Sequence, residues 1–324
     1  MYIIDKSWEL AAENLAYEYC LMNEVKLRKN HNSILYLWQN KDSVVIGRNQ
    51  NPYKECDMNF ILQNKIELVR RITGGGAVYH DLGNLNYSFI CNDEDYDRNK
   101  VFNCIILALN SLGVSCNLSG RNDILANSVK ISGNAFYSAD KVVLHHGTIM
   151  VNVDINRMNY CLTPCKAKLN SKGVLSVKGR VGNLNDINKQ LDIFQIKKAI
   201  SSQFSCLVDE IDYDINIDKD LFYNMTNKFT SSEWILGNYP LNYETISGQF
   251  AWGNISLGFI LDNDKIEQCY IESDSLYPED INELESWLKG LDLVRISENN
   301  IECAIEKTIF CDVVNLIREK LIYL

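Results

Sequence analysis

Three consecutive glycines separate two strand-like segments of this chain. Gly74, Gly75 and Gly76 follow residues 67–71, which end in two arginines, and they precede residues 77–80 (AVYH) and then an alternating run over 85–90. Glycine costs folding entropy and packs no side chain, so such a run is expected where the backbone adopts a positive φ or approaches another group closely. We predict a strand, a tight glycine loop beside a ligand, and a second strand.

The glycine loop differs from the familiar phosphate loops. It has neither a Gly-Lys-Ser/Thr ending nor a spaced Gly-x-Gly-x-x-Gly pattern, and a strand rather than a helix is expected to follow it. Its backbone amides would therefore bind an anion as a nest between strands. The alternative is a surface loop or hairpin turn without a ligand. Arg70 and Arg71 before the loop and His80 and Asp81 after it favour a ligand, because they add positive charge and a titratable group.

Length and composition indicate an ordinary globular protein. The 324 residues suffice for one large and one small domain, with 46% hydrophobic and 23% charged residues. The formal net charge of -10 and a pI near 5.0 argue against nucleic acid as the main partner, which would favour a basic face.

The cysteines and the chain's N-terminus bear on the cellular compartment. Of the eleven cysteines only Cys161 and Cys165 lie close together, and no second Cys/His pair follows them at metal-site spacing. Free buried thiols in a reducing compartment are the expected state. Because the N-terminus lacks the features of a signal peptide and no apolar run approaches membrane-spanning length, we expect a cytoplasmic protein without a membrane segment.

Hydrophobic spacing predicts the first elements. Residues 8–25 have apolar side chains at helical intervals, and Ser7 can cap this helix. Residues 34–38 and 43–47 are expected to be strands, and the short polar turn between them predicts a hairpin. A helix over 99–112 is expected to end at Gly113.

The remaining sequence changes character twice. Residues 114–153 predict a meander of short strands, and residues 154–243 predict mainly helices and loops. From residue 248 a small sheet is expected, followed by helices over about 278–289 and 313–322. We predict an α+β fold with a large domain over 1–243 and a small C-terminal α+β domain over 248–324.

Several polar residues stand out within these strands. Lys130 lies in an alternating segment that continues into Ser132-Gly133, and alone it would be a lysine on a solvated face. Three of the four histidines, His80, His145 and His146, lie near junctions of strands and polar loops, where ligand-binding residues concentrate. Residues 166–180 form the most basic stretch, either a solvated loop or a clamp for an anionic ligand or acidic partner.

Taken in order, these motifs resemble those of lipoate–protein ligases of the A type. This family belongs to the superfamily of biotin and lipoate protein ligases and octanoyltransferases. Each motif is weak alone, but the ordered set runs from end to end of the chain. The matching segments are residues 14–18 (NLAYE), 47–56 (GRNQNPYKEC), 70–81 (RRITGGGAVYHD), 120–123 (GRND), 130–133 (KISG), 145–148 (HHGT) and 172–177 (KGVLSV).

The resemblance implies a two-step reaction. Such enzymes activate lipoate with MgATP to lipoyl-adenylate and release pyrophosphate, and then transfer the lipoyl group to the ε-amine of a lysine. The acceptors are lipoyl domains of E2 subunits in 2-oxoacid dehydrogenase complexes or the glycine cleavage H protein, so the expected role is lipoate salvage. The large domain, 1–243, would bind lipoate and ATP on mixed β-sheets flanked by helices, and the domain at 248–324 would be an accessory module. No permanently bound cofactor is expected.

The resemblance also implies roles for individual residues around ATP. Arg71 and the amides of Gly75, Gly76 and Ala77 would offset the repulsion between two anions brought together for reaction. The next two residues, Val78 and Tyr79, would line the adenosine side.

Lys130 corresponds to the key lysine of the family. Its ammonium would bridge the lipoate carboxyl oxygen and the α-phosphate, so it would contact both substrates. Arg71 and His80 are further lipoate-binding candidates, with His80 ordering the acyl end or the loop. Asn122 is expected to contact the nucleotide, and Asp123 is the candidate Mg²⁺ ligand because hard cations prefer carboxylate oxygens.

The acyl tail needs an apolar slot, since each buried methylene adds about 0.8 kcal/mol. The sequence does not choose among its candidate lining residues, which are Tyr36, Leu37, Val44 and Ile46. Binding of this kind also predicts poor discrimination between lipoate and octanoate.

Two other functions remain open at this point. One is an octanoyl- or lipoyltransferase of the same fold, which would use a cysteine acyl-thioester and no ATP. The other is a non-catalytic lipoate or nucleotide sensor. The C-terminal domain favours the ATP-using branch, and the presence of Lys130, Arg71 and the glycines favours catalysis.

Overall fold

The computed structural model describes residues 1–28, 33–163, 181–207, 211–237, 239, 245–262, 265–292, 296 and 308–321. The chain forms two compact units. The larger unit comprises Met1–Ile46, Pro52–Arg71 and Ala77–Ile235, and the smaller unit comprises Gly47–Asn51, Ile72–Gly76 and Leu236–Leu324. The glycine loop therefore belongs to the smaller unit. The domain boundaries expected from the sequence remain a prediction, and the basic stretch at 166–180 lies outside the described residues.

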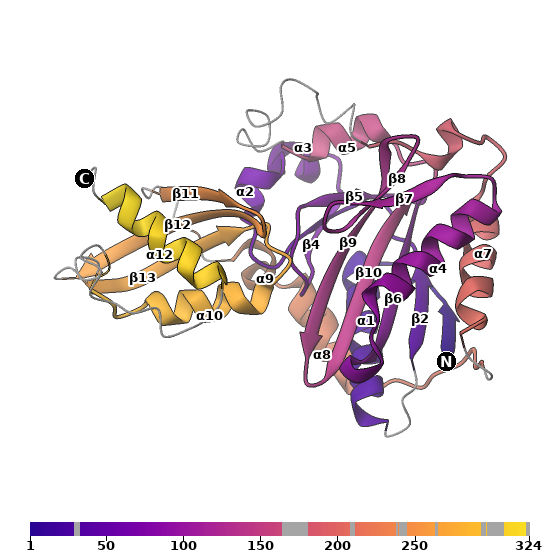
Figure 1. The fold of residues 1–324 in the computed structure, drawn as a ribbon, viewed down its shortest axis with the longest axis horizontal. Coiled ribbons are helices and arrows are strands. Elements are labelled where there is room, and N and C mark those ends of the chain that lie inside the picture. Colours follow the sequence, from indigo (N-terminus) through magenta and orange to yellow (C-terminus); the bar gives the residue numbers. More distant parts are fainter. Residues whose placement is uncertain are drawn as a thin grey trace. The chain divides into compact units, whose positions relative to one another are not determined.

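A seven-stranded mixed sheet forms the centre of the larger unit (Figure 1). Its first two strands are parallel and all other neighbouring pairs are antiparallel. The predicted meander over 114–153 is confirmed by the last four strands. In spatial order the strands are β1 (Tyr2–Asp5), β2 (Ile34–Trp38), β6 (Asn84–Asn92), β10 (Val142–Met150), β9 (Val129–Ala139), β8 (Asp123–Ala126) and β7 (Cys116–Ser119).

Helices cover both faces of this sheet. α4 (Arg98–Ser111) and α7 (Ile193–Ser205) pack on one face, where they share an apolar core with Leu85, Tyr87 and Phe89 of β6. α1 (Ala11–Leu27) and α8 (Lys219–Thr230) pack together on the other face. Because side chains alternate along a strand, Ser88 of β6 faces α1 instead. The face of the large sheet that α1 covers thus carries polar side chains that are buried.

A second, three-stranded sheet belongs to the same unit. β3 (Ser43–Ile46) lies between β4 (Glu67–Arg70), to which it is parallel, and β5 (Val78–His80), to which it is antiparallel. Strands therefore flank the glycine loop, as predicted, but both pair with β3 rather than with each other. The helices around this sheet are α2 (Pro52–Glu55), α3 (Met58–Gln63) and α5 (Ile155–Cys161).

The predicted hairpin over residues 34–47 is wrong. β2 pairs with β1 and β6 in the large sheet, whereas β3 pairs with β4 and β5 in the small one. Every residue of β2 is buried, as expected for a strand with neighbours on both edges and helices on both faces. Val44 and Ile46 of β3 pack into a separate apolar cluster with α3 and α5. The short polar turn connects two sheets instead of two paired strands.

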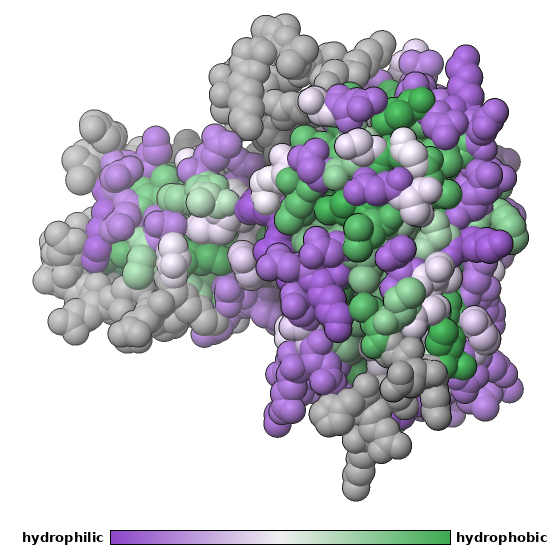
Figure 2. Space-filling view, turned by 45° about the vertical axis from the view of Figure 1, so that its right-hand side comes forward, coloured by the Kyte–Doolittle hydropathy of each residue, from purple (hydrophilic) through white to green (hydrophobic). Residues whose placement is uncertain are grey.

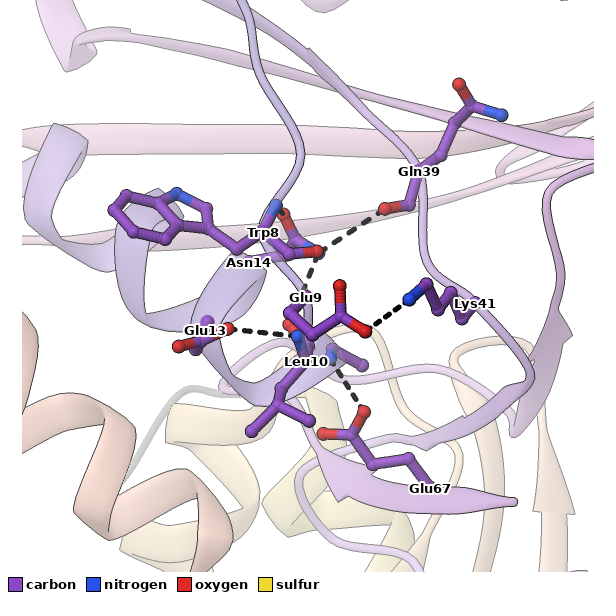
Figure 3. A network of polar contacts seen from close by, with 9 residues as sticks. Trp8, Glu9, Leu10, Glu13, Asn14, Gln39, Lys41 and Glu67 are labelled. Carbon is purple, nitrogen blue, oxygen red and sulfur yellow. Dashed lines mark hydrogen bonds and ion pairs between the residues drawn. The ribbon is translucent and has the colours of Figure 1, made fainter. Parts of the chain in front are cut away.

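The start of α1 is held by a carboxylate distant in the sequence (Figure 3). The predicted cap, Ser7, instead accepts a hydrogen bond from the Gln39 amide at 2.9 Å. Glu67 of β4 accepts from the Ala11 and Ala12 amides at 2.7 and 3.0 Å. A carboxylate satisfies the unpaired amides at a helix N-terminus and interacts favourably with the helix dipole. Glu67 therefore joins the small sheet to α1.

The smaller unit contains a sheet-then-helix module, as predicted. Its three antiparallel strands are β11 (Thr245–Phe250), β12 (Gly253–Asp262) and β13 (Lys265–Ser273), and its helices are α10 (Pro278–Leu288) and α12 (Thr308–Leu321) (Figure 1). Apolar residues of the sheet and both helices form its core, including Leu257, Leu284 and Phe310. The remaining described elements of the chain are α9 (Ser232–Leu236) and the 3-10 helices η1 (Asp93–Asp95) and η3 (Leu184–Asp186).

Hydrophilic residues cover much of the described surface in the view of Figure 2, with apolar residues between them. Within the described ranges, no helix is both long and apolar enough to cross a membrane.

Replacing Glu67 by alanine should lower the free energy of unfolding by about 1–2 kcal/mol, because two helix amides lose a charged acceptor. Urea unfolding measures this. Glu9→Ala is the control, because Glu9 is exposed and only pairs with Lys41 at the surface. Equal losses for the two variants would contradict the capping role of Glu67.

Candidate functional site

Buried polar side chains gather between α1 and the large sheet. Glu18 of α1 accepts hydrogen bonds from the Ser88 hydroxyl and, at 2.9 Å, from Nδ1 of His146. The Trp38 indole donates to the Ser88 oxygen at 3.0 Å. These residues come from α1, β2, β6 and β10, so the fold joins the 14–18 and 145–148 motifs.

A chain of amides leads from α1 to His80. Asn14 donates to the Asn40 side-chain oxygen at 2.9 Å, and the Asn40 amide nitrogen lies 3.0 Å from Nδ1 of His80. Because the amide nitrogen can only donate, Nδ1 accepts and Nε2 carries the proton. Nε2 has no partner among the described residues. Burial, followed by the nearby charge of Arg71, lowers the pKa of His80 to about 3. His80 therefore offers one buried neutral N–H to a ligand.

The two adjacent arginines have different surroundings. Arg70 donates to the carbonyls of Trp234 and Ile235, and the Trp234 indole donates back to the Arg70 carbonyl at 2.8 Å. Arg71 donates to the Val45 carbonyl at 3.0 Å. Burial lowers its pKa to about 10, opposed by the carboxylate of Glu18, so it stays charged at neutral pH. Arg71 thus adds a fixed positive charge near the polar cluster, whereas Arg70 holds the chain at α9.

Lys130 lies at an irregularity of the large sheet. The register between β8 and β9 shifts beside it, so one extra residue, Ile131, stands between Lys130 and Ser132. Bulges of this kind re-aim side chains and are frequent near active sites. The Lys130 Nζ lies 2.8 Å from Oδ1 of Asp123, and both side chains are 35% exposed. A Cβ at Gly133 would lie 3.0 Å from this Nζ, so glycine leaves room for the lysine.

Asn122 and Asp123 both have protein partners. The Asn122 side-chain nitrogen donates to the Asn134 carbonyl, and the Asp123 carboxylate pairs with Lys130. In the described part of the chain, no group of three or more His, Cys, Asp or Glu residues could hold a metal ion. Mg²⁺ bound to a nucleotide needs only one or two carboxylates, with phosphates and waters completing its shell. A contact between Asp123 and the ion of MgATP therefore stays a prediction.

The glycine loop packs within the smaller unit. Gly75 has φ of 88°, the backbone freedom that the sequence suggested, and its amide donates to the Ser275 carbonyl at 3.0 Å. A Cβ at Gly74 would lie 1.9 Å from the same carbonyl oxygen. Close backbone approach thus requires glycine here. The anion nest over Gly75, Gly76 and Ala77 stays a prediction, and in this conformation the Gly75 amide already has an acceptor.

The side chains of Ala77, Val78 and Tyr79, which follow the glycine loop, differ in their surroundings. The Tyr79 ring packs with the apolar cluster of α3 and α5, and burial raises the pKa of its phenol, so the phenol stays protonated. Ala77 packs against the same cluster. Val78 is half-buried and pairs with Val45. β5 is an edge strand of the small sheet, so the backbone of this segment has an edge that is not paired within that sheet. This agrees with backbone contacts to adenosine, which remain a prediction.

The candidate residues of the acyl slot separate in space. Leu37 lies in the core below α4 and α7, and Val44 and Ile46 lie in the cluster of the small sheet. Tyr36 faces α1, and its hydroxyl donates to Asn14 at 3.0 Å. Of the four, only Tyr36 hydrogen bonds into the polar cluster.

Two functional candidates were missed from the sequence. Asn84 and Asn86 of β6 are fully or almost fully buried, and Asn84 donates to the Asn86 side-chain oxygen at 3.0 Å. The other amide atom of each has no partner among the described residues, which is costly unless a ligand or water satisfies it. Alternating asparagines in an otherwise apolar strand were the available signal.

Comparison with known proteins identifies the family. Residues 11–205 match the lipoyl protein ligase A/B catalytic domain, and residues 243–322 match the bacterial lipoate protein ligase C-terminus. A lipoate-protein ligase A from Blochmanniella floridana is 39% identical over 270 residues, 80% of each chain. The chain belongs to the lipoate–protein ligase family.

Solved ligase structures agree with this family. LipL1 of P. falciparum in complex with lipoate is 28% identical, with a TM-score of 0.82 over 100% of this chain and 99% of that one. A bipartite lipoate protein ligase from Thermoplasma acidophilum, described with its E2 lipoyl domain, has a TM-score of 0.63 at 25% identity over 74% and 98% of the two chains. A lipoate-protein ligase A bound with ATP has a TM-score of 0.62 at 25% identity over 73% and 98%. The predicted family, the α+β fold and the enzyme class are confirmed.

The thiols of this ligase do not favour cysteine catalysis. Among the described residues, seven cysteines are buried and two, Cys206 and Cys311, are exposed. Burial raises the pKa of the buried thiols, for example to about 12 for Cys56 and about 11 for Cys161. A transferase would need a thiol whose pKa is lowered.

His80 should make the fold less stable in acid. Between its pKa of about 3 in the fold and its ordinary value of 6.5, the unfolded chain binds a proton that the folded chain does not. This stability is complete above the ordinary value and is lost as pH falls, by up to about 1.4 kcal/mol per pH unit. His80→Gln should reduce the slope of the unfolding free energy against pH by the equivalent of about one bound proton. Urea unfolding between about pH 4.5 and 7 measures this slope. An unchanged slope would contradict a buried neutral His80.

Proposed function

We propose that this chain catalyses ATP-dependent attachment of lipoate to protein. In the first step a lipoate carboxylate oxygen attacks the α-phosphorus of ATP, and pyrophosphate leaves. In the second step the amine of an acceptor lysine attacks the carbonyl carbon of lipoyl-adenylate, an amide bond forms, AMP leaves and the amine loses a proton. Residues 1–243 would carry this chemistry, and residues 248–324 would be accessory.

The position of Lys130 carries this proposal. Gly133, beside Lys130, bonds through its amide to the Thr148 hydroxyl of β10 at 3.2 Å. Thr148 lies opposite Asn86 on β6, and Asn86 lies opposite Trp38 on β2. The lysine therefore stands at the end of a cross-strand row that leads to the buried polar cluster. One end of the row offers an ammonium and the other offers neutral donors beneath α1.

Electrostatics explains why this arrangement suits acyl-adenylate formation. Lipoate carboxylate and the α-phosphate repel each other, so positive groups fixed in advance lower the barrier to their reaction. Lys130 would bridge one oxygen of each group, and Arg71 would add charge on the nucleotide and carboxylate side. The same ammonium would stabilise the adenylate when the acceptor amine attacks.

The uncharged residues would orient the substrates. The free N–H of His80 and the open amide atoms of Asn84 and Asn86 would satisfy polar atoms of the ligands. The nucleotide would be contacted by Val78, the backbone of Tyr79, and Asn122. The amides of Gly75, Gly76 and Ala77 would also contact it, once the Gly75 amide no longer donates to Ser275. Asp123 would contact the Mg²⁺ of MgATP while it orients Lys130.

The acceptor would be a lipoyl domain. The archaeal relative described with its E2 lipoyl domain supports this class of partner. We propose E2 subunits of 2-oxoacid dehydrogenase complexes or the glycine cleavage H protein as acceptors, and a role in lipoate salvage. The cytoplasmic location stays a prediction.

Lys130→Ala should reduce lipoate adenylation about 10²- to 10³-fold, as loss of a transition-state donor does elsewhere. The fold should stay intact, because the side chain is one-third exposed. Lipoate-dependent pyrophosphate release measures the rate, and thermal unfolding measures the fold. The control is Lys26→Ala, which also removes an ion-paired lysine but lies at the surface beside Asp140. A rate equal to that of the parent would remove Lys130 from the mechanism.

The same assay separates the other two functions when an apo lipoyl domain and an octanoyl acyl carrier are added. The ligase forms lipoyl-lysine only with lipoate and ATP. A transferase would modify the domain from the acyl carrier without ATP, and a sensor would bind its ligand without turnover. Either result would replace the proposed function.

A further inference from the structure

The strand that carries Lys130 separates from its neighbour close to the lysine. β9 pairs with β10 from Ala139 to Asn134, and the pairing ends there. Towards Lys130, β9 continues beside β8, with the bulge between them, and on its other edge Lys130 pairs with Val181 and accepts a hydrogen bond from the Gly182 amide at 3.0 Å. On the β10 side, the Thr148 hydroxyl takes the place of the ladder through its hydrogen bonds with Gly133. The backbone at Gly133 is therefore held on the β10 side by a side chain.

Asn134 occupies the point of separation and connects both sides. Its backbone amide and its side-chain nitrogen donate to the Asn122 carbonyl at 2.9 and 3.1 Å. The Asn122 side chain donates back to the Asn134 carbonyl. Asn134 thus binds the residue that precedes Asp123, the partner of Lys130. Its side chain is buried, with an exposed fraction of 4% for the residue.

The other end of the Asn134 amide is fixed from the far side of the sheet. Its oxygen accepts hydrogen bonds from the Tyr87 hydroxyl and, at 3.1 Å, from Nε2 of His145. Because the Asn134 oxygen can only accept, Nε2 of the neutral imidazole carries the proton, so Nδ1 accepts from the Tyr96 hydroxyl, 3.2 Å away. Burial keeps the pKa of His145 well below its ordinary value, so this imidazole is neutral.

Gly147 leaves the space that this arrangement needs. It lies opposite Asn134 on β10, and a Cβ there would lie 2.4 Å from the Asn134 side-chain oxygen and 2.7 Å from the Tyr87 ring. Any side chain at 147 would displace one of them. The sheet is therefore built to bring the Tyr87 hydroxyl to Asn134.

We propose that Asn134 is a positioning residue for Lys130. The inference rests on the proposed function, because it assumes that Lys130 acts on the substrates. Asn134 touches no reacting atom in this account. It holds Asn122, so that Asp123 stays against the ammonium and the ammonium stays aimed. Tyr87 and His145 hold Asn134 in turn.

Only an amide meets both requirements at this position. The oxygen end must accept from two donors, and the nitrogen end must donate to a carbonyl. Aspartate has the same shape and accepts equally well, but it cannot donate unless protonated. Asn134→Asp therefore removes the side-chain hydrogen bond to the Asn122 carbonyl, leaves the two bonds that use the Asn134 backbone, and keeps the volume and the acceptor.

Asn134→Asp should lower kcat for adenylation about 10- to 100-fold, the effect expected when a reacting group is misplaced by about 1 Å. KM for lipoate should change less than kcat, because Arg71 and His80, the other proposed lipoate contacts, are unchanged. The matched control is Asn117→Asp, the same change at an exposed position of β7, which should leave both constants unchanged. If Asn134→Asp does not fold, Tyr87→Phe is the milder variant. It removes one donor to the Asn134 oxygen and should lower kcat in the same direction.

A double-mutant cycle with Asp123→Asn tests whether Asn134 affects kcat through Asp123. If Asn134 acts by holding Asp123 on Lys130, its loss should add little once that carboxylate is absent, so the double variant should resemble Asp123→Asn alone. Multiplied losses would mean that the two residues act independently. An Asn134→Asp enzyme that only unfolds more easily, with kcat unchanged, would show a purely structural role. Either result would overturn the proposal.

Hydrogen exchange distinguishes a failure of the positioning role of Asn134 from a failure of the proposed function. Amides of residues 122–134 should exchange faster in Asn134→Asp, whether or not the protein makes lipoyl-adenylate, because the loss of the side-chain bond loosens this segment. Unchanged protection would contradict the clamp itself. Faster exchange in a protein without adenylation activity would retain the clamp and reject the function assigned to Lys130.

Discussion

Buried polar groups between α1 and the large sheet impose the constraint on which the site depends. A polar group removed from water must find a partner, or its desolvation cost remains. Glu18 is satisfied by Ser88 and His146, and Asn14 is satisfied by Asn40 and Tyr36. At His80, Asn84 and Asn86, buried side-chain atoms remain without a hydrogen-bond partner in the part of the chain that the structure describes. The fold thus provides hydrogen-bond partners for some of these buried polar groups and not for others. We expect the substrates to bind at the atoms that have none.

The adjacent arginines show how one strand serves both structure and chemistry. Arg70 is the last residue of β4 and Arg71 follows it directly, and successive side chains of an extended chain point to opposite sides. The Arg70 guanidinium bonds to backbone carbonyls of the chain at α9, and the Arg71 charge acts on His80 and Glu18. The glycines that follow serve another purpose, since Gly74 and Gly75 admit the backbone around Ser275 within the smaller unit.

Local sequence patterns predicted most of the elements and the order of the motifs. Helical spacing located α1 and α4, alternation located the strands from β7 to β10, and the triple glycine located a loop that needs positive φ. The failures were non-local. The cap of α1 comes from Glu67, 56 residues from Ala11, and no pattern around Ser7 could reveal it. The hairpin failed because β3 belongs to a second sheet, and Asn84 and Asn86 gained meaning only when their open amide atoms were seen.

The most direct test is a crystal structure with a non-hydrolysable lipoyl-adenylate analogue. The account predicts the Lys130 ammonium within about 3.2 Å of both the acyl carbonyl oxygen and an α-phosphate oxygen. It also predicts that Asp123 stays beside the lysine. An analogue bound elsewhere, with Lys130 turned away from both oxygens, would contradict it.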